Sequence, residues 1–162
     1  MTPLPVFLSV ALSVAVAASP AALPRLVISL ETGRPGKVMV RIENVSHQPL
    51  ALDARTYLAL VKDDTLEGPQ VPLYWAEVNA PGLPTASAPM HLAGRKKMSV
   101  PLDLRAVLWA PDRTGLSAGH TLARGVRPGE YELQVQIVDE RGAWWRSGGV
   151  PVKVLQGGGT AF

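Results

Sequence analysis

The clearest pattern in the chain is a strict alternation of apolar and polar residues over 130–137, within its C-terminal third. The alternating residues are Glu130, Tyr131, Glu132, Leu133, Gln134, Val135, Gln136 and Ile137. Period two is typical of a β-strand that has one face on a core and the other in water. Pro128-Gly129 supplies a turn directly before this stretch. We therefore expect a strand whose odd-numbered side chains are buried and whose Glu132 and Gln134 face solvent.

Shorter stretches along the chain repeat this pattern and are separated by turn-forming residues. The expected strands cover residues 26–31, 37–43, 50–52, 56–61, 73–78, 98–104, 130–137 and 150–154. Pro101 lacks a backbone N–H, so the strand over 98–104 should lie at a sheet edge or turn that position toward solvent. Residues 105–109 lack period two and are expected to form a single helical turn that crosses between sheets.

Facing sheets need one inward stripe from each long strand. Tyr131, Leu133, Val135 and Ile137 should therefore share a core with apolar residues of three other stretches. These partners are Val38, Val40, Ile42, Val152 and Val154. Burial of each such side chain contributes about 1.5–3 kcal/mol.

The N-terminal segment has a different character. An apolar run over 6–16 leads into Ala15-Val16-Ala17, a small-residue pattern that signal peptidase can cut. The segment before the run has no Lys or Arg. A run of about a dozen residues is too short to span a bilayer. We expect a signal peptide over 1–18, a linker over 19–24, one domain over 25–156 and a flexible tail over 157–162. Export without any cysteine favours a bacterial periplasm or exterior.

The segment around Tyr131 resembles the immunoglobulin-like and fibronectin-III-like β-sandwiches of exported bacterial proteins. The resemblance rests on Val126-Arg-Pro-Gly-Glu-Tyr131 and the hairpin after it. It implies an all-β, immunoglobulin-like sandwich of about seven to eight mostly antiparallel strands. It also implies a tyrosine corner at Pro128, Gly129 and Tyr131, with the hydroxyl bonded to backbone within 124–129. A narrower likeness to bacterial proteinase-inhibitor-like domains rests on residues 40–52, with the Asn44-Val-Ser turn followed by Pro49-Leu50.

Composition excludes several classes of function. The net charge of +3 is spread along the chain, with one short basic run at 95–97, which is too little for a nucleic-acid footprint. His47, His91 and His120 have no metal-ligand spacing, and no Gly-x-Ser-x-Gly elbow or phosphate-binding loop is present. Nothing brings loop carboxylates such as Asp63 and Asp112 together as an acid and a base. We therefore expect no catalytic residues, no metal and no cofactor.

Three further local features have ordinary structural explanations. Asp63, Asp64 and Glu67 lack the alternating spacing of a calcium loop and are expected in a solvated acidic turn. Asn44-Val-Ser46 fits the glycosylation pattern but is interpreted as a turn. The Pro- and Gly-rich stretch over 79–89 and the stretch over 112–127 are expected to be surface loops that do not pack in the core.

These observations predict a non-enzymatic, exported binding or structural module that recognises a protein or a cell-envelope component. The alternative is an inhibitor of extracellular proteases that acts through loop 79–89 or 112–127. A third alternative is a small hydrolase with an unusual site. The candidate binding surface is Trp144 and Trp145 with Arg141 and Arg146, because Trp and Arg are enriched at binding hot spots and exposed indoles stack on sugars.

The two indoles should point to opposite faces of an extended segment. Trp145 is the outward one if the inward parity of Val150, Val152 and Val154 extends back unbroken. A β-bulge at Gly148-Gly149 reverses that choice. A further alternative places both indoles flat over the end of the core with Arg stacked on them.

Overall fold

The structure is a computed structural model that describes residues 25–62, 71–113, 126–156 and 160–161. The described residues contain eleven β-strands. Their bounds are β1 Leu26–Thr32, β2 Lys37–Asn44, β3 Leu50–Leu52, β4 Ala54–Val61, β5 Pro72–Glu77, β6 Met90–Leu92, β7 Lys97–Asp103, β8 Gly129–Asp139, β9 Trp144–Arg146, β10 Val150–Val154 and β11 Thr160–Ala161. All eight expected strands are present, with ends shifted by one or a few residues.

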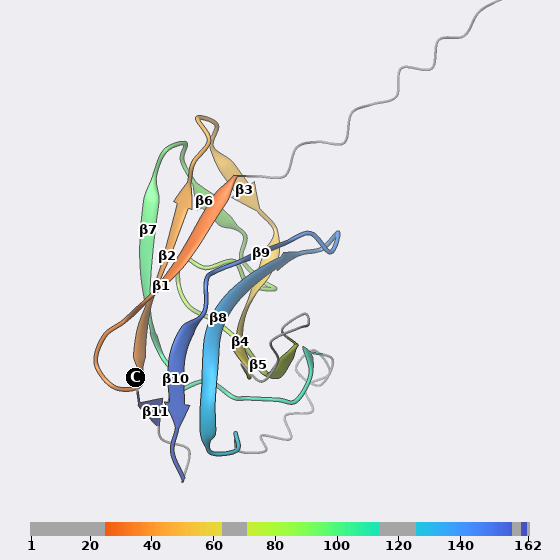
Figure 1. Cartoon of the computed structure of the whole chain (residues 1–162). Helices are drawn as coiled ribbons and strands as arrows, with labels where there is room; N and C mark the ends of the chain where they lie inside the picture. Colours follow the sequence, from red (N-terminus) through yellow and green to blue (C-terminus); the bar gives the residue numbers. More distant parts are fainter. Residues whose placement is uncertain (1–24, 63–70, 114–125, 157–159, 162) are drawn as a thin grey trace, which may run out of the picture.

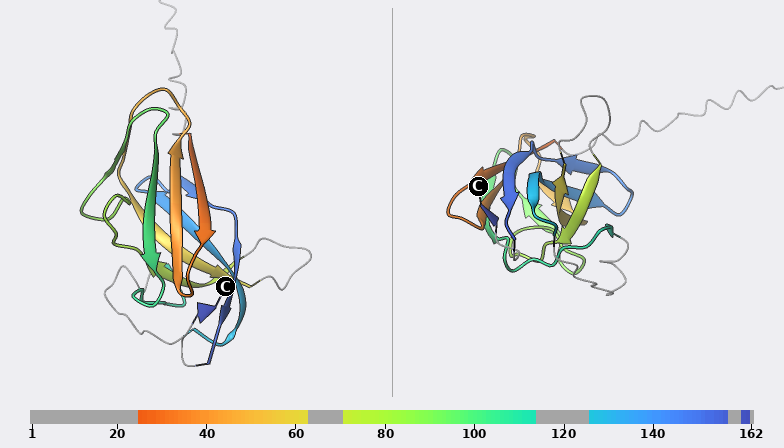
Figure 2. Two further views of the ribbon diagram at one scale, coloured as in Figure 1. Left: turned by 90° about the vertical axis from the view of Figure 1, so that its left-hand side faces the viewer. Right: turned by 60° about the horizontal axis from the view of Figure 1, so that its bottom comes forward.

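The strands form antiparallel sheets. A three-stranded sheet has the order β1-β2-β7, and a larger sheet has the order β11-β10-β8-β4-β5, with β9 paired to the far end of β8. The short strands β3 and β6 form a separate pair. Seen from the side of β7, the three-stranded sheet lies in front and the strands of the larger sheet pass behind it at an angle (Figures 1 and 2).

One hydrophobic core lies between these two sheets. The predicted stripe of β8 is buried in the same cluster as the predicted residues of β2 and β10. The buried members of that set are Val38, Val40, Ile42, Tyr131, Leu133, Val135, Ile137, Val152 and Val154. This part of the sequence prediction is confirmed.

The polar face of β8 differs from the prediction. Gln134 is only 3% exposed and Gln136 only 8%, although both point away from the core that holds Val135. Their partners in register on β4 are Ala59 and Tyr57, which are also buried. The outer face of the larger sheet is therefore covered near its middle, and the expectation of a fully solvated polar face was wrong.

Strand β7 lies at the edge of its sheet, as Pro101 required. The N–H of Leu104 donates to the carbonyl of Gly36 at 2.8 Å, on the side of β2. Because amides alternate along a strand, the nitrogen of Pro101 faces the open edge, where no ladder hydrogen bond is lost. A proline at this position also hinders pairing with a foreign strand.

The helical turn expected over 105–109 is not formed. The Asp103 carboxylate accepts a hydrogen bond from the Arg105 N–H at 3.0 Å, and the Ala106 N–H donates to the Asp103 carbonyl at 3.1 Å. These bonds close one tight turn. The chain then extends to Ala110, which exchanges two backbone hydrogen bonds of 2.7 and 2.8 Å with Trp75.

Three short strands, β6, β9 and β11, were not among the expected ones. Strand β6 pairs with β3 and has too few residues to show a period. Strand β11 pairs with β10, whereas the sequence suggested a flexible tail over 157–162. Backbone pairing to a sheet edge depends little on side chains, so composition alone does not reveal it.

Asn44 connects the segment before β3 to the end of β6 through hydrogen bonds of its side chain. It is 1% exposed, and its Nδ2 donates to the carbonyls of Gln48, Leu92 and Ala93 at 2.8, 3.2 and 3.3 Å. Its Oδ1 accepts from the N–H and hydroxyl of Ser46 at 3.0 and 2.6 Å. The turn predicted at Asn44-Val-Ser46 is present, and its amide nitrogen is committed inside the protein.

Candidate functional site

A rigid turn joins β8 to β9. The Asp139 Oδ1 accepts hydrogen bonds from the N–H groups of Arg141 and Ala143 at 3.0 and 2.7 Å. The backbone of Asp139 also donates to Ala143 and accepts from Gly142, whose φ of 83° favours glycine. This turn fixes the start of β9 and the two indoles that follow it.

The two indoles point to opposite faces, but in the reverse sense to the first expectation. Trp145 lies opposite Ile137 and packs against the core, whereas Trp144 lies opposite Val138 and is 53% exposed. Both predicted roles exist within one strand. Their assignment was wrong, because the parity of β10 does not continue into β9.

A β-bulge explains the reversal. The register of β9 on β8 is offset by one residue from that of β10, in which Val150 lies opposite Leu133. The offset falls over Gly148-Gly149, the place where a β-bulge is expected to exchange the inward and outward indoles. Ser147 anchors the bulge: its N–H donates to the carbonyl of Val135 at 2.9 Å, and its hydroxyl accepts from the Val135 N–H at 2.9 Å.

Trp144 and Arg146 form the exposed pair of the candidate surface. The guanidinium carbon of Arg146 lies 5.2 Å from the centroid of the Trp144 ring, within cation–π range. Arg141 is exposed in the turn before β9. The structure therefore keeps Trp144 and Arg146 together at the surface and removes Trp145 from it.

The surface extends across the larger sheet through residues in register. Val138 lies between Trp144 on β9 and Arg55 on β4. One step along, Gln136 lies between Arg146 and Tyr57. Neighbouring strands are about 4.8 Å apart, so these rows place Trp144 and Arg146 two strand spacings, roughly 10 Å, from Arg55 and Tyr57 of β4.

A shallow pocket of about 130 Å³ occupies this end of the sheet. It is lined by Asp53, Ala54, Arg55, Tyr57, Thr85, Ala86, Val138, Asp139 and Glu140. Asp53 precedes β4, Glu140 follows β8, and Thr85 belongs to loop 79–89, so three distant segments meet here. Sequence reasoning missed this pocket, although the register of β4 on β8 would have indicated it.

A second aromatic–cation cluster lies on the same face. The rings of Tyr57 and Trp75 meet edge to face at 6.2 Å, and the guanidinium carbon of Arg113 lies 5.7 and 5.0 Å from their centroids. Tyr57 is buried in this cluster. The cluster contributes to covering the outer face and was not predicted.

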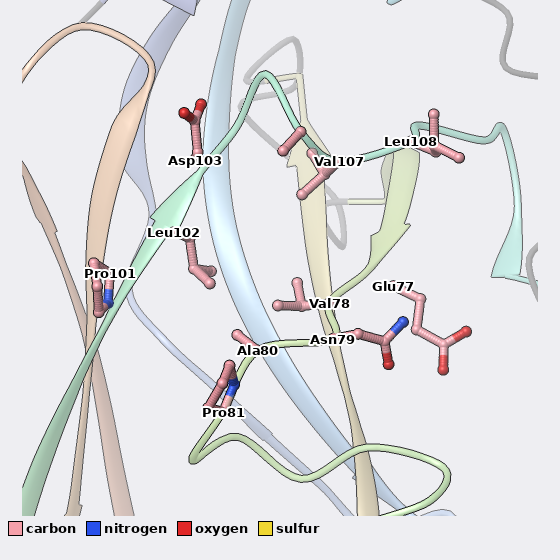
Figure 3. A pocket seen from close by; sticks show the side chains of 11 residues that line it. Glu77, Val78, Asn79, Ala80, Pro81, Pro101, Leu102, Asp103, Val107 and Leu108 are labelled. Atoms are coloured by element: carbon pink, nitrogen blue, oxygen red, sulfur yellow. The ribbon is translucent and has the colours of Figure 1, made fainter.

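A cleft of about 470 Å³ lies between the segment after β5 and the end of β7 (Figure 3). Apolar side chains surround it, including Val78, Leu102 and Val107. Asp103 points away from these side chains in Figure 3 and is bound by Arg105 at 2.7 and 2.9 Å. These hydrogen bonds lower the pKa of Asp103 to about 2. The described lining contains no serine, threonine, histidine or lysine, and its ionisable side chains are Glu77 and Asp103.

Loop 79–89 is partly built into the fold. Leu83 and Pro84 are buried, and the hydroxyl of Thr56 donates to the Pro84 carbonyl at 2.9 Å. The expectation that this loop cannot pack in the core was wrong for these two residues. Thr85 and Ala88 close a tight turn at the exposed tip.

The tyrosine of β8 makes the predicted hydrogen bond. The Tyr131 hydroxyl donates to the Arg127 carbonyl at 2.8 Å, and its ring meets that of Tyr74 edge to face at 6.0 Å. Gly129, two residues before it, has a φ of 159° and lies against the ring. Burial raises the pKa of Tyr131 above 10.0, and Tyr74 adds to the rise.

The remaining candidates divide into described and undescribed residues. His47 is exposed with its Nε2 3.0 Å from Arg95 Nη2, and His91 is exposed on β6. His120, the acidic residues Asp63, Asp64 and Glu67, and most of 112–127 lie outside the described residues. Within the described ranges, no group of three or more histidine or acidic side chains is close enough to hold a metal ion.

The described residues contain no helix with the length and apolar character needed to cross a membrane. Neither the known protein-family models nor the curated protein sequences give a match to this chain.

Proposed function

We propose that the chain is an exported, non-enzymatic binding module with an immunoglobulin-like β-sandwich fold that recognises a cell-envelope partner. The strand orders support the fold. An immunoglobulin sandwich has strands A, B and E in one sheet and strands G, F, C and C′ in the other. The orders β1-β2-β7 and β10-β8-β4-β5 match that arrangement. Tyr131, near the start of β8, then stands where the tyrosine corner of strand F belongs.

The N-terminal sequence supports export. The apolar run over 6–16 and the small residues after it have the form of a signal peptide, and the linker over 19–24 leads into β1. The absence of cysteine suits a bacterial envelope, where small exported domains are stable without disulfides. A partner in that compartment is a protein or an envelope polymer.

The observation that carries the binding function is the exposed Trp144 with Arg146 over its ring. A hydrogen-bonded turn precedes the strand that holds them, and Trp145 of the same strand packs against the core. Trp and Arg that are held rigidly lose little conformational freedom on binding, which is why they dominate binding hot spots.

Sedimentation with isolated bacterial cell envelopes tests this function. The protein is recovered from a host that expresses the full chain. The wild type should co-sediment, and Trp144→Ala should bind at least tenfold more weakly with an unchanged melting temperature. Leu108→Ala is the matched control, because Leu108 is 57% exposed and lines the separate cleft between β5 and β7. Equal binding by the wild type and Trp144→Ala would refute the proposal.

A protease-inhibition assay checks the alternative function. The closed turn at the tip of loop 79–89 gives that alternative no support. The binding-module proposal predicts no inhibition of general serine, cysteine or metalloproteases. Nanomolar inhibition of any of them would replace it.

A further inference from the structure

Trp144 and the shallow pocket belong to one continuous surface. Val138 lines the pocket and lies directly opposite Trp144 on β9. Directly opposed residues of an antiparallel pair have Cβ atoms about 4.5–5.5 Å apart. The indole therefore stands beside the mouth of the pocket, with Arg146 over one of its faces.

The pocket offers both hydrogen-bond acceptors and donors, with an excess of acceptors. Asp53, Asp139 and Glu140 bring carboxylates, whereas Arg55 and Thr85 bring a guanidinium and a hydroxyl. Arg55 also forms an ion pair of 3.6 Å with Glu77. The excess of carboxylates disfavours an anionic ligand. The carboxylates accept hydrogen bonds from hydroxyl groups, and Arg55 and Thr85 donate to them, so the lining suits a neutral ligand rich in hydroxyl groups.

The size of the pocket sets the shape of the ligand. A volume of 130 Å³ corresponds to about four water molecules at ~30 Å³ each. This is well below the roughly 300–1,000 Å³ of sites that enclose a small-molecule ligand. The pocket can take only the polar edge of one ring, and the rest of the ligand must lie outside it, across the indole.

We propose that this surface binds a neutral oligosaccharide. One sugar ring stacks its apolar C–H face on Trp144, on the side of the indole away from Arg146, and a neighbouring ring places hydroxyl groups in the pocket. This inference rests on the proposed function and specifies the chemical class of the partner. A protein partner is the competing outcome.

Titration with defined soluble sugars is the first test, with chitotetraose and cellotetraose as probes. In ¹H–¹⁵N NMR spectra, the indole N–H signal of Trp144 should shift with at least one tetrasaccharide. The matching monosaccharide should bind at least tenfold more weakly, because it cannot reach both subsites. Trp144→Ala and Glu140→Gln should each weaken binding at least tenfold, whereas Leu108→Ala should not. No shift with either tetrasaccharide, or equal affinity in Glu140→Gln, would overturn the inference.

Protease treatment of the envelopes separates this inference from the proposed function. If the partner is a glycan, wild-type protein still binds envelopes stripped with proteinase K, and the tetrasaccharide competes. Loss of Trp144-dependent binding after stripping would identify a protein partner, which overturns the glycan inference and leaves the binding function intact. Tetrasaccharide binding through Trp144 without envelope binding would overturn the proposed envelope-binding function and leave the glycan inference intact.

Discussion

Replacing Asn44 by alanine should be among the most destabilising polar substitutions in the domain. The side chain is 1% exposed and reaches three backbone carbonyls as well as Ser46. Alanine removes every one of these hydrogen bonds while the backbone groups stay in place. The segment before β3 and the segment at the end of β6, which Asn44 connects, then lose their common hydrogen-bond partner.

The magnitude follows from counting the bonds that Asn44 can make at once. Its Nδ2 has two hydrogens, so the contacts of 3.2 and 3.3 Å to Leu92 and Ala93 share one of them. Two donated bonds and the two bonds accepted from the Ser46 N–H and hydroxyl remain. A buried group left unsatisfied costs about 1–3 kcal/mol, whereas groups near the surface regain water. We expect a total loss of about 2–4 kcal/mol of unfolding free energy.

Urea unfolding followed by far-UV circular dichroism measures this loss. The midpoint should fall with an unchanged slope, since the amount of surface exposed on unfolding stays the same. Asn79→Ala makes the same chemical change at an exposed position and should cost less than about 0.5 kcal/mol. A loss in Asn44→Ala no larger than in Asn79→Ala would refute the reasoning.

Asn44→Asp adds a second test with a defined pH dependence. The introduced carboxyl is buried beside carbonyl oxygens, so its pKa in the folded state should lie above the unfolded value of about 3.9. Its folded form is therefore favoured while it is protonated. The variant should approach the wild type below about pH 4 and lose stability as the pH rises toward 7.

Three further predictions concern other parts of the fold. Tyr131→Phe should lose about 1 kcal/mol at neutral pH. Because the pKa of Tyr131 is raised in the folded state, the stability that its protonated hydroxyl contributes is intact below pH 10.0 and lost as the pH rises above it. Urea midpoints of the wild type should therefore fall more steeply in alkali than those of Tyr131→Phe. Arg105→Ala should raise the pKa of Asp103 from about 2 toward 3.8 in an NMR titration, and an unchanged value would contradict the assigned cause. Gly94→Ala should cost about 1–3 kcal/mol in thermal unfolding, because an added Cβ would overlap a backbone carbonyl, while Gly148→Ala should cost much less since no atom lies nearby.

Alternation of side chains predicted the strands well, because β1, β2, β7 and β10 each bury one face, whereas β4 is buried on both faces. The inward stripe of β8 and its partners on β2 and β10 followed from period two alone. The same rule failed for Gln134 and Gln136. Their burial depends on Tyr57, Trp75 and Arg113, which come from distant parts of the chain and show no joint signal in the sequence.

The candidate surface was half predictable. The sequence marked Trp144 and Arg146 by their residue types, and Gly148-Gly149 as the place where a bulge would exchange the indoles. Whether the bulge forms depends on hydrogen bonds between Ser147 and Val135, which propensity does not reveal. The pocket beside Trp144 depends on the register of β4 on β8, and register was not assigned from the sequence.

The two indoles of β9 provide the most direct test of the binding surface. Trp144→Ala and Trp145→Ala are compared for unfolding free energy and for binding to cell envelopes. Trp144→Ala should keep the wild-type stability within about 1 kcal/mol and lose at least tenfold in affinity. Trp145 packs on the core, so Trp145→Ala should lose about 3 kcal/mol of stability while its folded fraction still binds. A loss of stability in Trp144→Ala as large as in Trp145→Ala, or wild-type affinity in Trp144→Ala, would contradict the account.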